Sequence, residues 1–422
     1  MPSLRGSDDF KGQIYHHKHL GQTDLINDPN VKDVTVIGGG KSAADVVYAF
    51  AKANKNVSWV IRTTGTGGPL LTPAEGVGPY LNAPEIGMTR IAGILSPSPF
   101  SPYTWTQCFL HSTRLGESLV RSFFALSESA CTRLADYHSR KNALPGFSSL
   151  APTSVSLRWL VGNIGVITHP DFWDVVAQSV HIHRGDMTRL QGHTAILSNG
   201  EELRSDLVVD CTGYKSTLPF LSPGLKAHLG LPCPSSAMPP TLLAHWTDLE
   251  KAEDKRILSR FPFLSNAPSD PSSTIKSDSE AESSQPYRLY RGILSPYAPL
   301  VLIGHLLHGN HFMAAEVQAI WAVAALSGRL EIPDKKDMEG DIASFVAWAW
   351  RRYPAHSETA NSVVLEGMGY LDSLLGEMDL SCCSKGWWRD GVLPVLPKDL
   401  DGLVGQWRER CRVRGVSVES DL

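Results

Sequence analysis

The clearest pattern of apolar and polar positions lies between residues 31 and 63. Residues 34–37 are four consecutive β-branched residues, which is typical of a strand buried on both faces of a parallel sheet. After them, apolar residues recur at the spacing of a helix with one buried face, at Ala43, Val46, Val47 and Phe50. A polar turn follows, and then a second apolar run over residues 57–61. The pattern predicts a compact strand–helix–strand unit.

The chain around this unit is less regular. Residues 1–30 are polar and predict an irregular segment. Residues 64–165 are rich in Gly, Pro and Ser at both ends and contain a helical stretch near 104–141. Residues 166–225 predict short strands and turns, and the pair Asn199-Gly200 between two strand-like runs predicts a β-hairpin.

The second half of the chain contains a polar segment and a helical tail. Residues 265–286 hold eight serines among 22 residues, a composition that buries too little apolar surface to offset chain entropy. They therefore predict a disordered loop. Residues 334–422 predict helices with aromatic side chains. With 422 residues and many Gly and Pro turns, the chain predicts an α/β fold of two or three domains, or of one large nested domain.

Composition excludes several classes of partner. The formal net charge of −4 gives no electrostatic reason to expect nucleic acid or an anionic membrane. The seven cysteines show no C-x-x-C spacing, so neither a metal site nor a disulfide framework is expected. No apolar run approaches the about 18 residues needed to span a bilayer, and residues 1–10 lack the apolar core of a signal peptide. We expect a soluble, cytoplasmic protein.

The strongest chemical signal follows the first strand of the predicted unit. Gly38, Gly40 and Ala43 occupy the small-residue positions of the pattern G-x-G-x-x-A. The first glycine permits a sharp turn, the second lets a pyrophosphate approach the backbone, and the alanine lets helix and strand pack closely. Exposed N–H groups at the start of the helix then bind the anion. The pattern therefore predicts a dinucleotide-binding turn.

The predicted binding residues in this turn are Gly38, Gly39, Gly40, Lys41, Ser42 and Ala43. An ordinary glycine turn in an α/β sheet is the alternative. Asp45 needs no ligand to explain it, since an acid in the first turn of a helix is favoured by the helix dipole.

The residue that closes the second strand distinguishes NAD from NADP, because NAD enzymes place an acid there for the ribose hydroxyl. This chain has Arg62, followed by Thr63 and Thr64, 24 residues after Gly38. A cation with hydroxyl neighbours suits a 2′-phosphate, so Arg62 and Thr63 predict a preference for NADPH. A solvated surface arginine is the alternative.

Several further segments carry a family resemblance. Residues 10–16 fit F-x-G-x-x-x-H, the fingerprint ahead of the NADPH turn in flavin-containing and Baeyer–Villiger monooxygenases. Other stretches resemble this family in its own order, namely 206–215, 289–293, 302–304, 316–321 and 370–375. The chain most resembles the fungal branch of the family, whose members act in secondary metabolism.

The resemblance implies an FAD- and NADPH-dependent monooxygenase that hydroxylates or oxidises a small organic metabolite with O2. It places Thr212 and Gly213 at the NADPH site, and it places Gly304, Asn310 and Glu316 near the flavin. No catalytic acid or base is assigned, because this class relies on its cofactor and on burial. The sequence predicts neither the substrate nor the oligomeric state.

The resemblance also implies a division of the chain. Residues 1–30 would be a linker carrying the F-x-G-x-x-x-H motif, and residues 31–225 a Rossmann-like NADPH-binding domain with a helical insert at 64–165. Residues 226–333, including the predicted loop, would be a remnant of the FAD-binding domain. A helical region over 334–422 would follow. The insert would shape the substrate site.

Two features depart from the family pattern. Leu20 stands where the fingerprint has an aromatic residue, which argues against lactone formation and for hydroxylation or heteroatom oxidation. In addition, only 37 residues precede Gly38, whereas the family carries a further G-x-G-x-x-G unit for FAD ahead of the NADPH turn. Residues 65–68 are no substitute, because they lack the strand and the helix. We therefore expect the FAD pyrophosphate segment to be missing.

Two alternatives remain open. One is a truncated, non-catalytic fragment that binds only NADP(H). The other is a flavin-free NADPH-dependent reductase, which we disfavour because the chain lacks a Y-x-x-x-K pair placed as short-chain reductases require.

Overall fold

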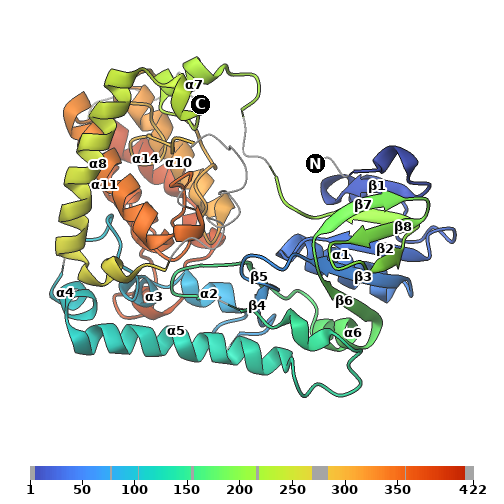
Figure 1. The fold of residues 1–422 in the computed structure, drawn as a ribbon. Coiled ribbons are helices and arrows are strands. Elements are labelled where there is room, and N and C mark those ends of the chain that lie inside the picture. Colours follow the sequence, from blue (N-terminus) through green and yellow to red (C-terminus); the bar gives the residue numbers. More distant parts are fainter. Residues whose placement is uncertain are drawn as a thin grey trace. The chain divides into compact units, whose positions relative to one another are not determined.

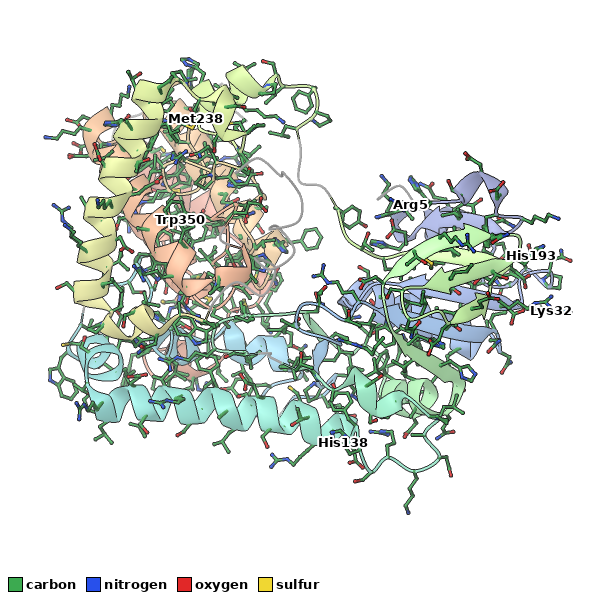
Figure 2. All side chains as sticks on the ribbon, viewed as in Figure 1. Arg5, Lys32, His138, His193, Met238 and Trp350 are labelled. Carbon is green, nitrogen blue, oxygen red and sulfur yellow. The ribbon has the colours of Figure 1, made fainter. Side chains whose placement is uncertain are left out.

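The protein is described from a computed structural model covering residues 5–76, 78–102, 104–153, 156–214, 218–268, 284–356 and 358–413. Its described residues form two compact units (Figure 1), each with its own packed side chains (Figure 2). The first unit comprises the described parts of residues 1–75 and 123–216, and the second those of 76–122, 217–269 and 280–422.

The first unit is built on a five-stranded sheet in the order β1-β10-β2-β3-β6. Its strands are β1 (Gln13–His16), β10 (Leu207–Asp210), β2 (Asp33–Ile37), β3 (Asn56–Ile61) and β6 (Val180–Arg184). Every neighbouring pair is parallel. This confirms the predicted α/β class with a Rossmann-type parallel sheet.

The predicted strand–helix–strand unit is confirmed as β2, α1 (Lys41–Lys52) and β3. The apolar face of α1 is buried as its spacing predicts, with Ala43, Val47 and Phe50 fully shielded from solvent. These side chains join the strands in one apolar core.

Two elements of the first unit differ from the prediction. Residues 13–16, expected to be irregular, form the edge strand β1, whose mostly polar sequence gives no apolar alternation to recognise. Residues 166–225, expected to be strands and turns, contain the helix α6 (Phe172–Ser179), which packs beside α1. An apolar run this short does not distinguish a helix from a strand by pattern alone.

A small antiparallel sheet lies on the first unit, made of β7 (Met187–Gln191), β8 (Thr194–Leu197) and β9 (Glu202–Arg204). The predicted hairpin at Asn199-Gly200 is confirmed between β8 and β9. Gly200 has a φ of 86°, a conformation that glycine adopts without strain.

The predicted insert contains the expected helical stretch, as α4 (Trp105–Ser112) and α5 (Arg114–Ala135). Shorter helices α2 (Ala83–Gly87) and α3 (Arg90–Ile94) precede them. Its two ends pair as the parallel strands β4 (Leu70–Thr72) and β5 (Ile164–Val166).

The second unit is mainly helical. Its longest helix, α8 (Pro240–Arg260), lies beside α11 (Lys335–Arg352) (Figure 1). Among its described residues it also contains the helices α7 (Pro223–Leu229), α10 (His311–Leu326), α12 (Gly367–Glu377), α13 (Arg389–Val392) and α14 (Leu403–Val413). The predicted helical region over 334–422 is thus confirmed for its described residues. No helix in the described ranges is long and apolar enough to cross a bilayer.

Short 3-10 helices connect these elements. They are η1 (Ser7–Asp9), η2 (His17–Gln22), η3 (Phe147–Leu150), η4 (Ser235–Ala237), η5 (Pro262–Asn266), η6 (Pro354–His356) and η7 (Pro397–Leu400).

The predicted disordered loop over 265–286 lies largely outside the described residues. The described residues at its two ends have regular structure. Ser265 and Asn266 belong to η5, and Ser284 forms a β-bridge with Pro234, so the predicted loop is shorter than 265–286.

The second unit buries charged side chains in its interior. Arg352 and Glu366 form an ion pair of 2.7 Å with 1% and 0% of their side chains exposed. Arg288 and Glu250 form a second pair at 2.8 Å. Burial raises the pKa of Glu250, and the nearby Arg288 opposes this shift. Each charge is therefore tolerated because its partner is buried with it.

Candidate functional site

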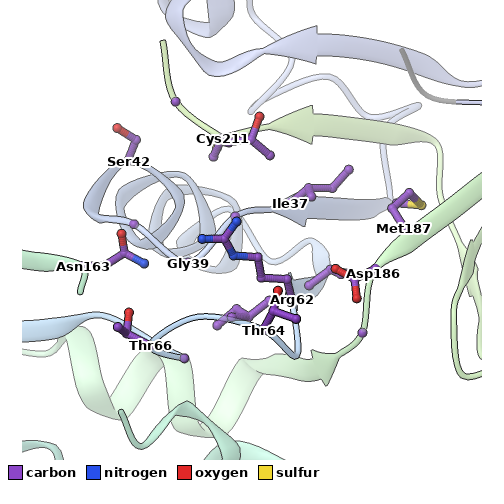
Figure 3. A pocket seen from close by; sticks show the side chains of 18 of the residues that line it. Ile37, Gly39, Ser42, Arg62, Thr64, Thr66, Asn163, Asp186, Met187 and Cys211 are labelled. Atoms are coloured by element: carbon purple, nitrogen blue, oxygen red, sulfur yellow. The ribbon is translucent and has the colours of Figure 1, made fainter. Parts of the chain in front are cut away.

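The candidate site is a cavity of about 880 Å³ at the carboxyl edge of the parallel sheet (Figure 3). From β2 the chain proceeds through α1 to β3, whereas β10 lies on the other side of β2. The strand order therefore reverses between β2 and β10, and ligands of open α/β sheets bind at such a point. The turns after four strands line the cavity, contributing residues 37–42, Arg62, Gly185 with Asp186, and 211–214.

Gly38 is required by the fold itself. Its φ is 134°, and a methyl group there would lie 2.5 Å from the carbonyl oxygen of Cys211. The turn is further fixed by its backbone N–H, which donates to the Val60 carbonyl at 3.0 Å. In addition, the indole N–H of Trp59 donates to the Gly38 carbonyl at 2.6 Å. The turn is thus rigid before any ligand arrives.

Gly40 has a different role. Its φ of −97° suits any residue, and a methyl group there would meet only Asn163 Oδ1, at 3.8 Å, among the described atoms. The fold therefore leaves free space in front of Gly40, as a ligand approaching the backbone would require. No side chain of the described residues caps α1, so its first N–H groups are available to an anion.

The neighbouring residues of the turn fall into two groups. Ala43 is fully buried below the turn, where helix and sheet meet. Gly39, Lys41 and Ser42 line the cavity. Lys41 also forms an ion pair with Asp45 one helical turn later, which gives that carboxylate a partner besides the helix dipole.

Arg62 lines the cavity from the end of β3 and is exposed. Within the described part of the chain, no ion pair engages its guanidinium. Thr63, predicted with it, is not among the lining residues, and its hydroxyl donates to Asp186 at 3.3 Å. Thr64 and Thr66 line the cavity instead.

The segment after β10 is held by a local hydrogen-bond set. The backbone N–H and the hydroxyl of Thr212 both donate to Asp210 Oδ1, at 2.9 and 2.6 Å. Thr212 and Gly213 line the cavity, and Gly213 has a φ of 104°. Burial raises the pKa of the neighbouring Cys211 to about 12, so this thiol stays protonated and unreactive.

His16 secures the same segment from β1. Its Nδ1 accepts from the backbone N–H of Lys18 at 3.2 Å, so the ring proton is assigned to Nε2. That nitrogen donates to the Gly213 carbonyl at 3.0 Å. The fingerprint histidine thus contacts backbone, and the rings of His16 and Tyr214 lie 5.2 Å apart.

Sequence reasoning missed several lining residues: Arg5, Asn163, Met187, Thr188 and Asp186. They come from segments remote in sequence, and no spacing links them to the glycine turn. The sheet topology alone brings them together.

The residues predicted near a flavin belong to the second unit. The backbone N–H of Gly304 donates to Gln318 Oε1 at 2.9 Å, and Gly304 has a φ of 76°. Asn310 caps α10 by accepting from the Met313 N–H at 3.2 Å. Glu316 is exposed on the same helix.

The prediction that the chain lacks a Y-x-x-x-K pair after the cofactor turn is wrong. The Y-x-x-x-K spacing occurs twice, at Tyr48 with Lys52 and at Tyr137 with Lys141. The structure gives the better reason to disfavour a reductase, because none of these side chains lines the cavity. Tyr48 and Lys52 both donate to Asp171, at 2.7 and 3.1 Å, and Tyr137 is buried in the apolar core.

Comparison with known proteins identifies the class suggested by this fold and cavity. No protein-family model matches the chain. An FAD-dependent monooxygenase of Pyrenophora dematioidea is 33% identical, over 84% of this chain and 66% of its own length. The FAD-dependent monooxygenase rstn6 of Aspergillus nomiae is 31% identical, over 96% and 72%. The corresponding resA protein of Aspergillus sclerotiorum is 30% identical, over 99% and 74%.

The chain belongs to this family of FAD-dependent monooxygenases, and the resemblance drawn from its motifs is confirmed. It spans about two thirds to three quarters of the length of these three relatives. Among solved structures, cyclohexanone monooxygenase from Rhodococcus sp. Phi1 bound to NADP+ is a weak match. It is 12% identical, has a TM-score of 0.46, and aligns with 89% of this chain and 70% of its own.

Proposed function

We propose that this chain forms the NADPH-binding part, and a portion of the FAD-binding part, of a cytoplasmic monooxygenase. The enzyme would use NADPH, FAD and O2 to oxidise a small organic molecule in fungal secondary metabolism. Hydroxylation or heteroatom oxidation is favoured over lactone formation, because Leu20 replaces the aromatic residue of the fingerprint. Family membership supports the FAD chemistry.

The observation that carries the NADPH assignment is the pairing of two features in one cavity. The uncapped start of α1 at Gly40 offers N–H groups to the diphosphate, and Arg62 at the end of β3 offers a cation to the 2′-phosphate. Thr212 and Gly213 would border the same coenzyme. The free space in front of Gly40 fits this ligand.

FAD would be held in part by the second unit, near Gly304, Asn310 and Glu316. A methyl group at Gly304 would meet nothing within 4 Å, so its backbone is open to a ligand. When bound, FAD supplies the oxygen activation that no side chain of this chain can provide.

The first experiment compares NADPH and NADH binding in the wild type and in Arg62→Ala. We expect wild type to prefer NADPH and the variant to lose most of that preference. Arg189→Ala, an exposed arginine of β7 outside the cavity, is the control and should leave the ratio unchanged. An unchanged ratio in Arg62→Ala would refute the role of Arg62.

A visible spectrum of the purified chain, recorded with oxygen uptake, separates the alternatives. A yellow protein that consumes oxygen with NADPH supports the monooxygenase. A colourless protein that binds NADPH without consuming oxygen supports a fragment that binds only NADP(H). NADPH oxidation without flavin would indicate a reductase.

A further inference from the structure

Asn163 lies beside the glycine turn, although it follows Lys52, the last residue of α1, by 111 positions in the sequence. A methyl group on Gly39 would lie 3.3 Å from Asn163 Nδ2, and one on Gly40 would lie 3.8 Å from Asn163 Oδ1. Figure 3 shows this side chain among those that line the cavity, together with Ser42 and Arg62. The amide thus faces the place where the turn leaves room for a ligand.

The backbone around Asn163 is fixed by the fold. Its carbonyl accepts from the Leu70 N–H at 2.7 Å, where β4 and β5 begin to pair. Two residues later, Gly165 packs so closely on α1 that a methyl group there would lie 3.0 Å from Lys41 Cβ. The strand pair is therefore held against the first turn of the helix without help from a ligand.

The side-chain amide of Asn163 is available to bind a ligand. It makes no hydrogen bond to any other residue in the part of the chain that the structure describes, yet it borders the cavity. The nearest cation of the turn, Lys41, already bonds to Asp45. A neutral amide therefore adds N–H donors beside the turn without adding charge.

We infer that the Asn163 side chain donates a hydrogen bond to the diphosphate of NADP(H), opposite the N–H groups of α1. This inference rests on the proposed NADPH site. It assigns the insert a role in coenzyme binding, since Asn163 lies at its end. Hydrogen bonds to charged groups are stronger than those between neutral groups, so removing the Asn163 amide should lower the affinity for NADP(H) measurably.

Asn163→Asp tests the inference most sharply, because it keeps the shape, removes both donors and places a negative charge beside the diphosphate. We expect the dissociation constant for NADP+ from calorimetry to rise at least about thirtyfold, and about fivefold for Asn163→Ala. Asn54→Asp is the matched control, at the other end of α1 and exposed, and it should bind NADP+ as wild type does. Melting temperatures verify that each variant folds.

A second ligand separates this role from a structural one. Adenosine 2′-monophosphate carries the 2′-phosphate but no diphosphate. Asn163→Asp should therefore leave the affinity of the protein for this ligand, measured by competition with NADP+, unchanged. Arg62→Ala should weaken that affinity. Equal NADP+ affinity in Asn163→Asp and Asn54→Asp would overturn the inference and leave the proposed function standing. If folded wild type bound neither NADPH nor NADH, the proposed function itself would fail.

Discussion

The two units differ in what fills their interiors. In the first unit the sheet and helix α1 share an apolar core that includes Val36, Val47 and Trp59, each fully buried. The second unit places complete ion pairs in its interior, with Arg352 and Glu366 as the most shielded. The first core rests on non-directional burial, and the second depends on specific partners. The second unit should therefore be the more sensitive to single changes of charge.

The largest loss of stability is expected from Glu366→Ala in the second unit. The carboxylate accepts from Arg352 Nε at 2.7 Å and also from the Tyr353 hydroxyl. Its removal breaks a fully buried ion pair by deleting one partner, at a cost of about 3–5 kcal/mol. Hydrogen exchange read separately in α11 and β2 should show the loss in α11 only.

The double variant Arg352→Met with Glu366→Leu sharpens this test. It removes both charges and should recover much of the lost stability. A double variant as unstable as Glu366→Ala would contradict the view that retaining one charge of the broken pair causes the loss of stability.

A pH effect of intermediate size is expected from His305 in the second unit. Both ring nitrogens of His305 are buried. Burial lowers the pKa of His305 from 6.5 to about 4. The unfolded chain then binds the proton first as pH falls, so stability is present above pH 6.5 and lost toward pH 4.

The loss of folding free energy caused by His305 should reach about 3 kcal/mol at the acid end of that pH range. Burial lowers the pKa of His308 in the same direction. Denaturant unfolding at several pH values should show that the free energy of unfolding falls less steeply with falling pH in His305→Gln than in wild type. Parallel curves for the variant and wild type would exclude His305 as a cause.

A smaller effect is expected in the apolar core of the first unit. Val47→Ala removes two methyl groups from the fully buried face of α1 and should cost about 2 kcal/mol. The loss should not depend on pH between 5 and 8, since no charge is involved. Urea unfolding monitored in β2 measures this loss of stability. A loss that depends strongly on pH would show that the core of the first unit also depends on charged groups.

The same contrast explains how much the sequence could predict. The unit from β2 to β3, the hairpin at Asn199-Gly200 and the glycine turn depend on local spacing, and all three were predicted. The strand β1 was missed because an edge strand need not alternate. Asn163 and Asp186 could not be found, because only the folded chain brings the start of β5 and the end of β6 to the cavity.

The most direct test of the central claim is calorimetry with NADPH on Gly40→Val. The fold leaves room for a side chain at this position, so the variant should melt as wild type does, as should the control Gly21→Val at another open glycine. We predict that NADPH affinity falls at least about a hundredfold in Gly40→Val and is unchanged in Gly21→Val. Wild-type affinity in a folded Gly40→Val protein would show that the coenzyme diphosphate does not bind at this turn.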